Sequence, residues 1–234
     1  DWYIFTMIFS PQCIVLLLLA QPLSSSSATW TTFRQSRQNR AFTTTTPADL
    51  SIVEYHTGNY VTSSPALSAN GKILYIGSLD RHLHAVDVTT NTLLWKYKTG
   101  SAINSSPCIS PDGNTIYVGS NDHKLHAVHA STGLQKWEYE TENWVFSSPT
   151  VSSTGEIVYV GSLDKKMHAI NAQTGTKNFT YDTGGEIWSS PVLSNDENTL
   201  YWGSHDKVVH ATDLWNIHIK QVGPEREKRF YKWK

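Results

Sequence analysis

Two residue types that can perform catalytic or metal-binding chemistry return at a fixed interval along this 234-residue chain. The step from His84 to His126 is 42 residues, and an aspartate stands four positions before each repeated histidine. The members are His84, His126, His168 and His210, with Asp80, Asp122, Asp164 and Asp206. An imidazole is a common metal ligand, and a carboxylate can serve as a catalytic base.

Both groups are nevertheless predicted to be structural. Residues kept in every copy of a repeat serve the packing problem that every copy shares. Equivalent atoms of successive copies rotate apart around a ring, so the four histidines would not converge on one ion. Each aspartate stands at a tight turn, where Asp commonly bonds its own backbone. We therefore predict no catalytic residue, no metal ligand and no cofactor-binding residue.

The interval itself defines the fold. Ser-Ser-Pro begins each copy, at Ser63, Ser105, Ser147 and Ser189, and Gly-Ser recurs at Gly77, Gly119, Gly161 and Gly203. Tandem periods of 20–50 residues indicate solenoids, propellers or arrays. Within one copy the runs KILYIGS, HLHAVDV and TLLWKYKT are of strand type and are separated by turn residues. With the Ser-Ser-Pro run they make four strands, which is one propeller blade. The predicted fold is all-β: a β-propeller of four-stranded antiparallel blades with a 42-residue repeat, four of them in this chain.

The repeats are expected to span residues 49–215, with copies at 59–100, 101–142, 143–184 and 185–215. The run VEYHTG (Val53 to Gly58) matches WKYKTG (Trp95 to Gly100), so an outer strand precedes the first full blade. That strand could complete the fourth blade and close a small four-bladed ring. Alternatively, the chain holds part of a propeller of about seven or eight blades, and its open edges could then oligomerise.

Residues 1–48 are predicted to be a leader, and residues 216–234 a basic tail outside the repeat. The apolar run from Ile14 to Ala20, followed by small residues, is typical of a secretory signal. It is shorter than the roughly 20 residues of a transmembrane helix. A secretory signal would place the protein outside the cell or in the periplasm. The segment 2–48 has arginines but no acidic residue, which also fits an organelle transit peptide or a disordered leader.

Composition and motifs exclude several classes of function. The formal net charge is −1, so no global charge points to nucleic acid or a membrane surface. Cys13 and Cys108 give neither a metal-ligand spacing nor a disulfide framework. The sequence contains no phosphate-binding loop and no recognisable nucleophile with an activating base.

Function is expected where the copies differ. The innermost strand is predicted around Val61, Ile103, Val145 and Ile187, and its flanking residues vary from copy to copy. In a propeller this strand lines the axial channel, so the flanking residues would surround a bound ligand or peptide. The candidates are Tyr60, Thr62, Asn104, Trp144, Phe146, Glu186 and Trp188. The alternative is that the aromatic members simply plug the channel.

A second candidate surface follows the repeated aspartates. The turns there carry Arg81, His82, His123, Lys124, Lys165, Lys166 and Lys207. Strand alternation places these turns on the same face as the start of the innermost strand. They predict a ring of positive charge that could attract an acidic partner. The alternative is a set of solvated hairpin tips.

Two stretches carry a family resemblance. AVDVTTNTLLW (from Ala85) and AVHASTGLQKW (from Ala127) resemble the A-x-D-x-x-T-G-x-x-x-W docking motif of pyrroloquinoline-quinone-type propeller repeats, over residues 50–213. The resemblance implies that the Trp packs between blades and that the Gly makes a tight turn. The implied docking residues are Trp95, Gly133, Trp137, Gly175 and Phe179. Asn91 replaces the Gly in the first copy and Phe179 replaces the Trp in the third. WD-repeat proteins share the Gly-Ser-x-Asp turn, but their Trp-Asp dipeptide is absent.

The resemblance favours the non-catalytic branch of this family, similar to outer-membrane assembly lipoproteins. It implies a scaffold or binding module for a protein partner, with no cofactor. The alternative is a fragment of a quinoprotein dehydrogenase, which oxidises alcohols or sugars with pyrroloquinoline quinone and calcium. Such enzymes need calcium ligands and an aspartate base, and some carry adjacent cysteines. Here the acidic residues mostly occupy the repeated turns and no cysteines are adjacent, so we predict that the chain is not an enzyme.

Overall fold

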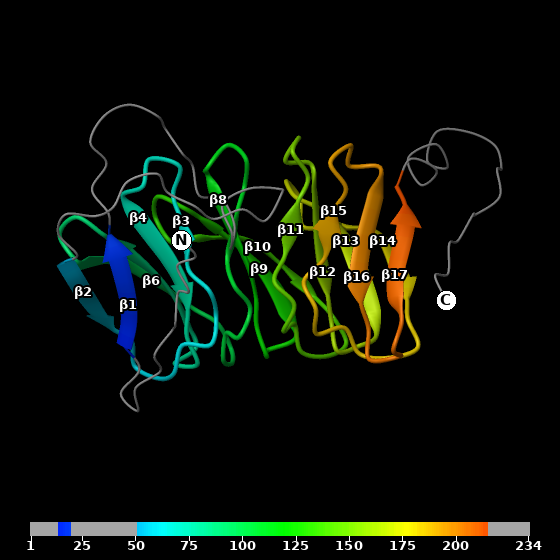
Figure 1. The fold of residues 1–234 in the computed structure, drawn as a ribbon, viewed down its shortest axis with the longest axis horizontal. Helices are drawn as coiled ribbons and strands as arrows, with labels where there is room; N and C mark the ends of the chain where they lie inside the picture. The colour runs from blue at the N-terminus through cyan, green and yellow to red at the C-terminus, as the bar shows by residue number, and fades with distance from the viewer. Residues whose placement is uncertain (1–13, 20–50, 215–234) are drawn as a thin grey trace, which may run out of the picture.

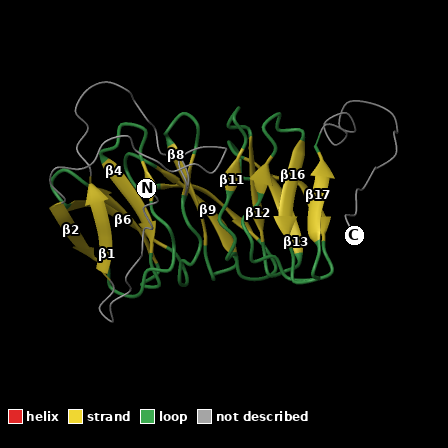
Figure 2. Ribbon diagram, viewed as in Figure 1, coloured by secondary structure: helices red, strands yellow, loops and turns green. Residues whose placement is uncertain are grey.

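The structure, a computed structural model, describes residues 14–19 and 51–214. All regular elements in these residues are strands, and Figure 2 shows them as upright sheets joined by loops. The all-β prediction is therefore confirmed. No helix long and apolar enough to cross a bilayer occurs among the described residues.

The first blade has the strand order β3-β4-β5-β6, with every neighbouring pair antiparallel. Its strands are β3 (Ala66–Leu67), β4 (Ile73–Gly77), β5 (His82–Asp87) and β6 (Thr92–Lys98). Most residues of β4 and β5 are buried, because apolar side chains on both faces of the sheet are covered. Strand β6 is the outermost, and its residues are exposed or half-buried.

The second and third blades repeat this arrangement, and the fourth begins it (Figure 1). The second comprises β7 (Cys108–Ile109), β8 (Thr115–Gly119), β9 (Lys124–His129) and β10 (Gln135–Glu140). The third comprises β11 (Thr150–Val151), β12 (Ile157–Gly161), β13 (Lys166–Asn171) and β14 (Lys177–Asp182). The fourth comprises β15 (Val192–Leu193), β16 (Thr199–Gly203) and β17 (Val209–Asp213).

The innermost strands are shorter than predicted and begin after the Ser-Ser-Pro motif. In the first blade, residues 60–65 have no regular secondary structure and bend at Ser63, and β3 starts at Ala66. The reason is a side chain that replaces a backbone partner. The Ser63 hydroxyl accepts a hydrogen bond from the Gly77 N–H (3.0 Å) and donates one to the Gly77 carbonyl (2.8 Å). Pro65 cannot donate at all, since proline has no N–H.

The second serine of each motif links one blade to the next. The N–H of Ser64 donates to Oγ of Ser106 (2.8 Å), and the N–H of Ser106 donates to Oγ of Ser148 (2.9 Å). The N–H of Ser148 then donates to Oγ of Ser190 (3.1 Å). These bonds run around the axis and hold the innermost segments of the four blades together.

The hydrophobic core lies between blades. Tyr75 and Leu83 of the first blade pack in one cluster with Ile116, Val118 and Val128 of the second. Equivalent clusters join the second blade to the third and the third to the fourth. Neighbouring sheets thus cover one another at three interfaces, and burial of these side chains is the main stabilising contribution.

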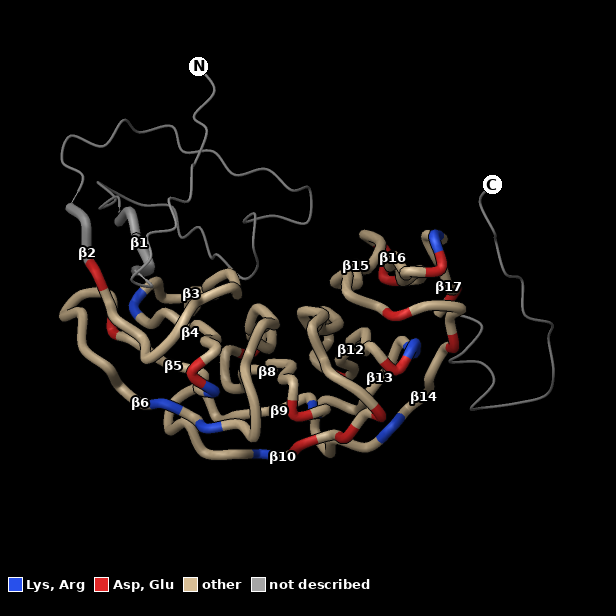
Figure 3. Tube along the Cα trace, turned by 90° about the horizontal axis from the view of Figure 1, so that it is seen from below, with Lys and Arg blue, Asp and Glu red and all other residues tan. Residues whose placement is uncertain are grey.

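The four blades form an open arc (Figure 3). The fourth sheet has three strands in the described residues, with β17 at its edge. The outer strand that precedes the first blade, β2 (Ser51–His56), pairs with β1 (Ile14–Leu19) and not with β17. The closed four-bladed ring is therefore wrong, and the partial propeller is the arrangement observed. Strand β1 lies inside the predicted leader; the rest of 1–48 and the tail 216–234 lie outside the described residues.

One face of the fourth sheet has no blade against it in the described part of the chain. Tyr201 is 37% exposed, whereas the equivalent Tyr159 of the third blade is 2% exposed. Val209 is 63% exposed, whereas the equivalent Met167 is fully buried. This apolar face is thus built like a blade interface.

Candidate binding face

Two sets of turns meet on one side of the arc, as the strand alternation predicts. The loops that lead from each outer strand to the next innermost segment contact the turns that join the second strand to the third. The Leu79 N–H donates to the Tyr60 carbonyl and the Leu163 N–H to the Trp144 carbonyl, both at 2.9 Å. We call this surface the loop face. It consists of residues 58–62, 100–104, 142–146 and 184–188, with the turns 78–81, 120–123, 162–165 and 204–207.

The repeated aspartate and histidine form a clasp between blades beneath the loop face. Asp122 lies 3.0 Å from Nε2 of His126, and the hydroxyl of Tyr97, from the preceding blade, lies 3.0 Å from Nδ1 of the same ring. The Asp122 carboxylate also accepts the Gly100 N–H at 2.7 Å. The first and third blades repeat the clasp with Tyr55–His84–Asp80 and Tyr139–His168–Asp164.

This geometry leaves the clasp of the second blade no catalytic chemistry to perform. Both ring nitrogens of His126 are occupied and the residue is 2% exposed, so it has no free base for a substrate. Burial would raise the pKa of Asp122, but hydrogen bonds from His126 and the Gly100 N–H outweigh it and hold that pKa below its ordinary value. The ionised aspartate therefore accepts from Nε2–H, and His126 accepts from Tyr97.

The family docking motif has a clear geometric basis. The indole N–H of Trp95 donates to the Ala130 carbonyl of the next blade (3.0 Å). Gly133 has φ +71°, and a Cβ there would lie 2.6 Å from Cδ2 of Trp95. Trp137 repeats the contact on Gly175, where a Cβ would lie 2.7 Å from its Cδ2. Only glycine fits, because both the left-handed backbone and the close approach exclude a side chain. Phe179 is half-buried in the cluster between the third and fourth blades.

In the first copy Asn91 stands at the position of this glycine, and the structure shows why glycine is not required there. The residue 42 positions before Trp95 is Val53, so no Trp is available to dock on the first copy. Asn91 keeps the left-handed backbone (φ 55°) and donates from Nδ2 to the Glu54 carbonyl at 2.7 Å. Asn tolerates this conformation better than other residues with side chains.

Four of the predicted channel residues stand at equivalent positions of successive blades and form one row: Thr62, Asn104, Phe146 and Trp188. Thr62 donates to Oδ1 of Asn104 at 2.9 Å, although 42 residues separate them. Further along the row, Phe146 stacks on Trp188 with ring centroids 4.7 Å apart. The first half of the row is therefore polar and the second half aromatic.

The aromatic half extends to four rings. Trp144 lies against Phe146 (5.8 Å), and Trp188 stacks on His205 (5.3 Å, 13° between planes). We call Trp144, Phe146, Trp188 and His205 the aromatic ladder. Its two tryptophans are 43% and 44% exposed. The indole N–H of Trp188 donates to Oε2 of Glu186 (2.9 Å), which fixes the orientation of this ring.

The predicted basic residues divide into two groups. Lys124 pairs with Glu138, and Lys166 pairs with Glu142 at 2.6 Å, so these charges are locally compensated. Arg81, Lys165 and Lys207 are exposed on the loop face. These three and His123 all have φ between 68° and 71°, a conformation that favours glycine.

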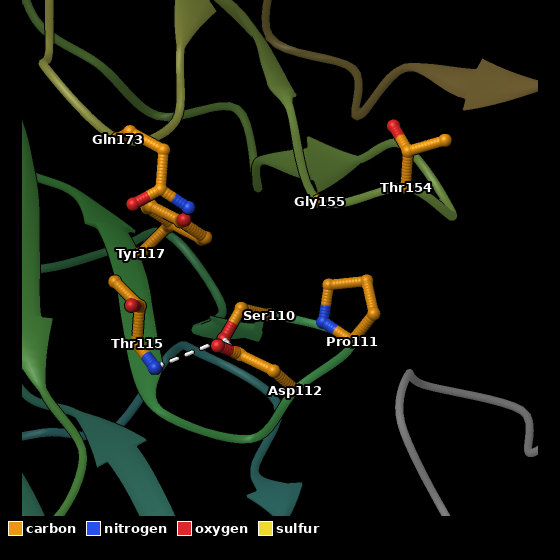
Figure 4. Close-up of a pocket in the computed structure, with 8 residues that line it drawn as sticks. All are labelled: Ser110, Pro111, Asp112, Thr115, Tyr117, Thr154, Gly155 and Gln173. Carbon is orange, nitrogen blue, oxygen red and sulfur yellow. Dashed lines mark hydrogen bonds between the residues drawn. The ribbon is translucent and has the colours of Figure 1, made fainter.

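A small cleft lies on the opposite side of the arc, between the second and third blades (Figure 4). It has a volume of about 330 Å³ and is lined by turn residues that include Ser110, Asp112, Thr154 and Gln173. Ser110 donates to Asp112, and this bond together with the Asn114 N–H lowers the pKa of that carboxyl. The carboxylate thus organises its own turn.

Residues 80–216 match the family model described as outer membrane protein assembly factor BamB. The chain belongs to this family. The crystal structure of BamB from Moraxella catarrhalis superposes with a TM-score of 0.62 at 22% sequence identity, over 71% of this chain and 51% of that one. The BamB-family chain described here therefore spans about half the length of that relative. No curated protein matches its sequence.

Calcium that accompanies a quinone cofactor needs oxygen ligands, and the carboxylates of the repeated turns and of the cleft already make other contacts in this BamB-family chain. The four repeated aspartates are occupied by histidines and by backbone N–H groups. The cleft offers one carboxylate, Asp112, which its own turn already uses. Burial raises the pKa of the Cys108 thiol to about 12, so this cysteine is a neutral thiol. The sequence has no cysteine next to it.

Two contacting residues were missed from the sequence. His205 completes the aromatic ladder, but it occupies a turn position held by Leu or Asn in the other copies, which gives no pattern to detect. Glu197 has φ 56° where the other copies have glycine, and it accepts the Ser153 N–H across a blade boundary (3.0 Å). The replacement of a repeated glycine could have marked it.

Proposed function

We propose that this chain is a non-catalytic protein-binding module of the BamB type, which uses its loop face to hold a partner protein. The observation that carries the proposal is the aromatic ladder. Trp144, Phe146 and Trp188 are contiguous, and the two tryptophans are exposed while Phe146 between them is half-buried. Tryptophan and other aromatic residues are enriched where protein interfaces gain most of their binding energy.

The charges around the ladder define the chemistry of the partner. Lys165 and Lys207 are exposed in the turns of the third and fourth blades, and Arg81 in the equivalent turn of the first blade, with no ion pair to any of the three among the described residues. Such charges steer an acidic partner and select its orientation. The partner we propose is a protein segment that offers an apolar side chain to the ladder and acidic groups to the turns. By analogy with the family, the site of action is the periplasm and the process is outer-membrane protein assembly.

The test is site-specific photo-crosslinking of the full chain in its native cell. A photoreactive phenylalanine analogue replaces Trp144 or Trp188, and the matched control replaces Leu134. Leu134 is 65% exposed but lies in the β9–β10 turn on the other side of the arc. We expect a discrete crosslinked partner from both ladder positions and none from Leu134. Equal labelling at all three positions, or none at any, would exclude the loop face as the binding surface.

Affinity measurement with the captured partner then tests the ladder itself. Trp188→Ser should weaken binding by about tenfold or more, as expected for an aromatic anchor. Trp144→Ser should act in the same direction, whereas Leu134→Ser should not change the affinity. A quinoprotein function would require cofactor-dependent oxidation of an alcohol, which we expect to be absent.

A further inference from the structure

One side-chain cluster distinguishes the first blade from the other three. The turn after β4 carries Asp80, and the following strand carries His82 and His84 on the same face. Each of the three residues offers a donor atom, and these atoms all lie within 4.8 Å of one another. In the sister blades the position of His82 is taken by Lys124, Lys166 and Val208.

The geometry points to a zinc-binding site formed by Nε2 of His84, Nδ1 of His82 and the carboxylate of Asp80. His84 Nε2 lies 2.9 Å from Oδ2 of Asp80, and His82 Nδ1 lies 3.5 Å from Oδ1. Tetrahedral zinc with bonds of about 2.0–2.1 Å places its ligand atoms about 3.3 Å apart. The three donor atoms here all lie within 4.8 Å of one another, so side-chain rotations would close the longer separations. Two imidazoles and a carboxylate are a donor set that zinc uses, with water as the fourth ligand.

The surroundings of the cluster suit a metal ligand. The Tyr55 hydroxyl lies 3.0 Å from Nδ1 of His84 and would orient the ring as an outer partner. The His82 side chain is 21% exposed and gives the ion its route from solvent.

Binding exchanges protons within the cluster without releasing one. The proton on Nε2 of His84, now donated to Asp80, would leave that nitrogen while Nδ1 gains one and donates it to the Tyr55 oxygen. The proton on Nδ1 of His82, now donated to the Asp80 carbonyl at 2.9 Å, would leave while the outer Nε2 gains one. Two hydrogen bonds are lost and three metal bonds form. Because Asp80 also accepts the Gly58 N–H (2.9 Å), the ion would fasten the leading strand β2 to the first blade.

The sister blades supply matched variants. His82→Lys reproduces the residue of the second and third blades, so the fold tolerates it, and it removes one ligand. Lys124→His creates the same Asp-x-His-x-His arrangement in the second blade. The untagged full chain is titrated with Zn²⁺ alone, and stoichiometry is measured by calorimetry or by competition with a chromogenic chelator.

We expect one saturable Zn²⁺ site in the wild-type chain, loss of this site in His82→Lys, and a second site in Lys124→His. Tyr55→Phe should weaken the site by about tenfold, as is usual when an outer partner of a ligand is removed. Co²⁺ in place of Zn²⁺ should give visible tetrahedral absorption in the wild type and none in His82→Lys. The assignment is overturned if the wild type binds no Zn²⁺, if His82→Lys binds it equally well, or if folded Lys124→His gains no site.

Discussion

The hydroxyl of Tyr97 lies 3.0 Å from Nδ1 of His126 in the next blade, so a hydrogen bond crosses the blade boundary. Burial raises the pKa of Tyr97 to about 12, which keeps the hydroxyl protonated as a donor. The same contact joins Tyr55 to His84 and Tyr139 to His168. The repeated histidines thus determine how one blade attaches to the next, and removal of His126 or His168 should affect stability rather than the binding of a partner protein.

Replacement of Tyr139 by phenylalanine should lower the free energy of unfolding by about 1–3 kcal/mol. The variant leaves Nδ1 of buried His168 without its partner, and a buried polar atom without a partner costs that much. Urea denaturation monitored by tryptophan fluorescence measures the change. The control is Tyr60→Phe, because Tyr60 is 57% exposed and its hydroxyl is in solvent. Equal stability of the two variants would exclude the clasp as a stabilising contact.

Asp164 should make stability depend on pH in the acid range. Burial alone would raise the pKa of Asp164. Hydrogen bonding to His168, the electrostatic attraction of that ring and two backbone N–H groups together outweigh burial, so the pKa of Asp164 is lowered from its ordinary value of 3.8. A carboxyl with a depressed pKa in the folded state stabilises the protein above the unfolded value, and this contribution is lost as pH falls below it. Asp164→Asn should therefore be less stable than wild type at pH 7, and the difference should shrink below about pH 4.

The control for this titration is Asp182→Asn, which changes an exposed carboxylate in the same blade. Denaturant titrations of the three proteins at successive pH values give the curves. If Asp164→Asn and wild type keep a constant separation down to acid pH, the pKa of Asp164 is not depressed by folding.

Gly133→Ala should destabilise the chain by about 2–4 kcal/mol, because the new Cβ meets a left-handed backbone and the Trp95 ring together. Gly113→Ala is the matched control: it has φ +75°, and a Cβ there meets nothing within 4 Å. It should cost about 1 kcal/mol from the backbone alone. The difference between the two isolates the contact with Trp95. Combining Gly133→Asn with Trp95→Val copies the first-copy pair, Asn91 and Val53, and should cost less than the sum of the single changes.

These docking residues show what the sequence could reveal. Trp95 and Gly133 recur with their spacing intact, because each blade must solve the same packing problem with the same residues. The Ser-Ser-Pro motif was equally visible, but a strand pattern does not show that a serine hydroxyl replaces a backbone partner, as Ser63 does. The choice between a closed ring and an arc depends on the rotation between blades, which no single residue encodes. His205 acquires its significance only from Trp188, which the fold brings to it, whereas the Asp-x-His-x-His pattern around His82 was visible in the sequence.

Lys165→Gly should raise the free energy of unfolding by about 0.5–1 kcal/mol. Lys165 has φ 70°, and this left-handed conformation is strained for a residue with a side chain. Glycine avoids the strain, and relief of the strain outweighs the larger backbone entropy that glycine loses on folding. The same substitution removes a charge from the loop face and should slow association with an acidic partner. Thermal unfolding and stopped-flow association measure the two effects. The control is Lys177→Ala, which removes a lysine charge from the outer strand β14. Lys166→Gly would not serve, because it would place a glycine within strand β13.

The open face of the fourth blade should cause self-association of the isolated chain. Val192, Tyr201 and Val209 are exposed there, whereas their equivalents in the second blade, Cys108, Tyr117 and Leu125, are buried against the third. An apolar sheet face of this kind associates with another apolar surface, and β17, which is the edge strand of this sheet in the described residues, adds a strand-pairing site. Sedimentation velocity should show association that increases with protein concentration. The double variant Tyr201→Ser/Val209→Thr should shift the distribution toward monomer, whereas Leu134→Ser, equally exposed but outside this face, should not. A wild-type chain that stays monomeric at all concentrations would mean that this face is covered by another part of the protein.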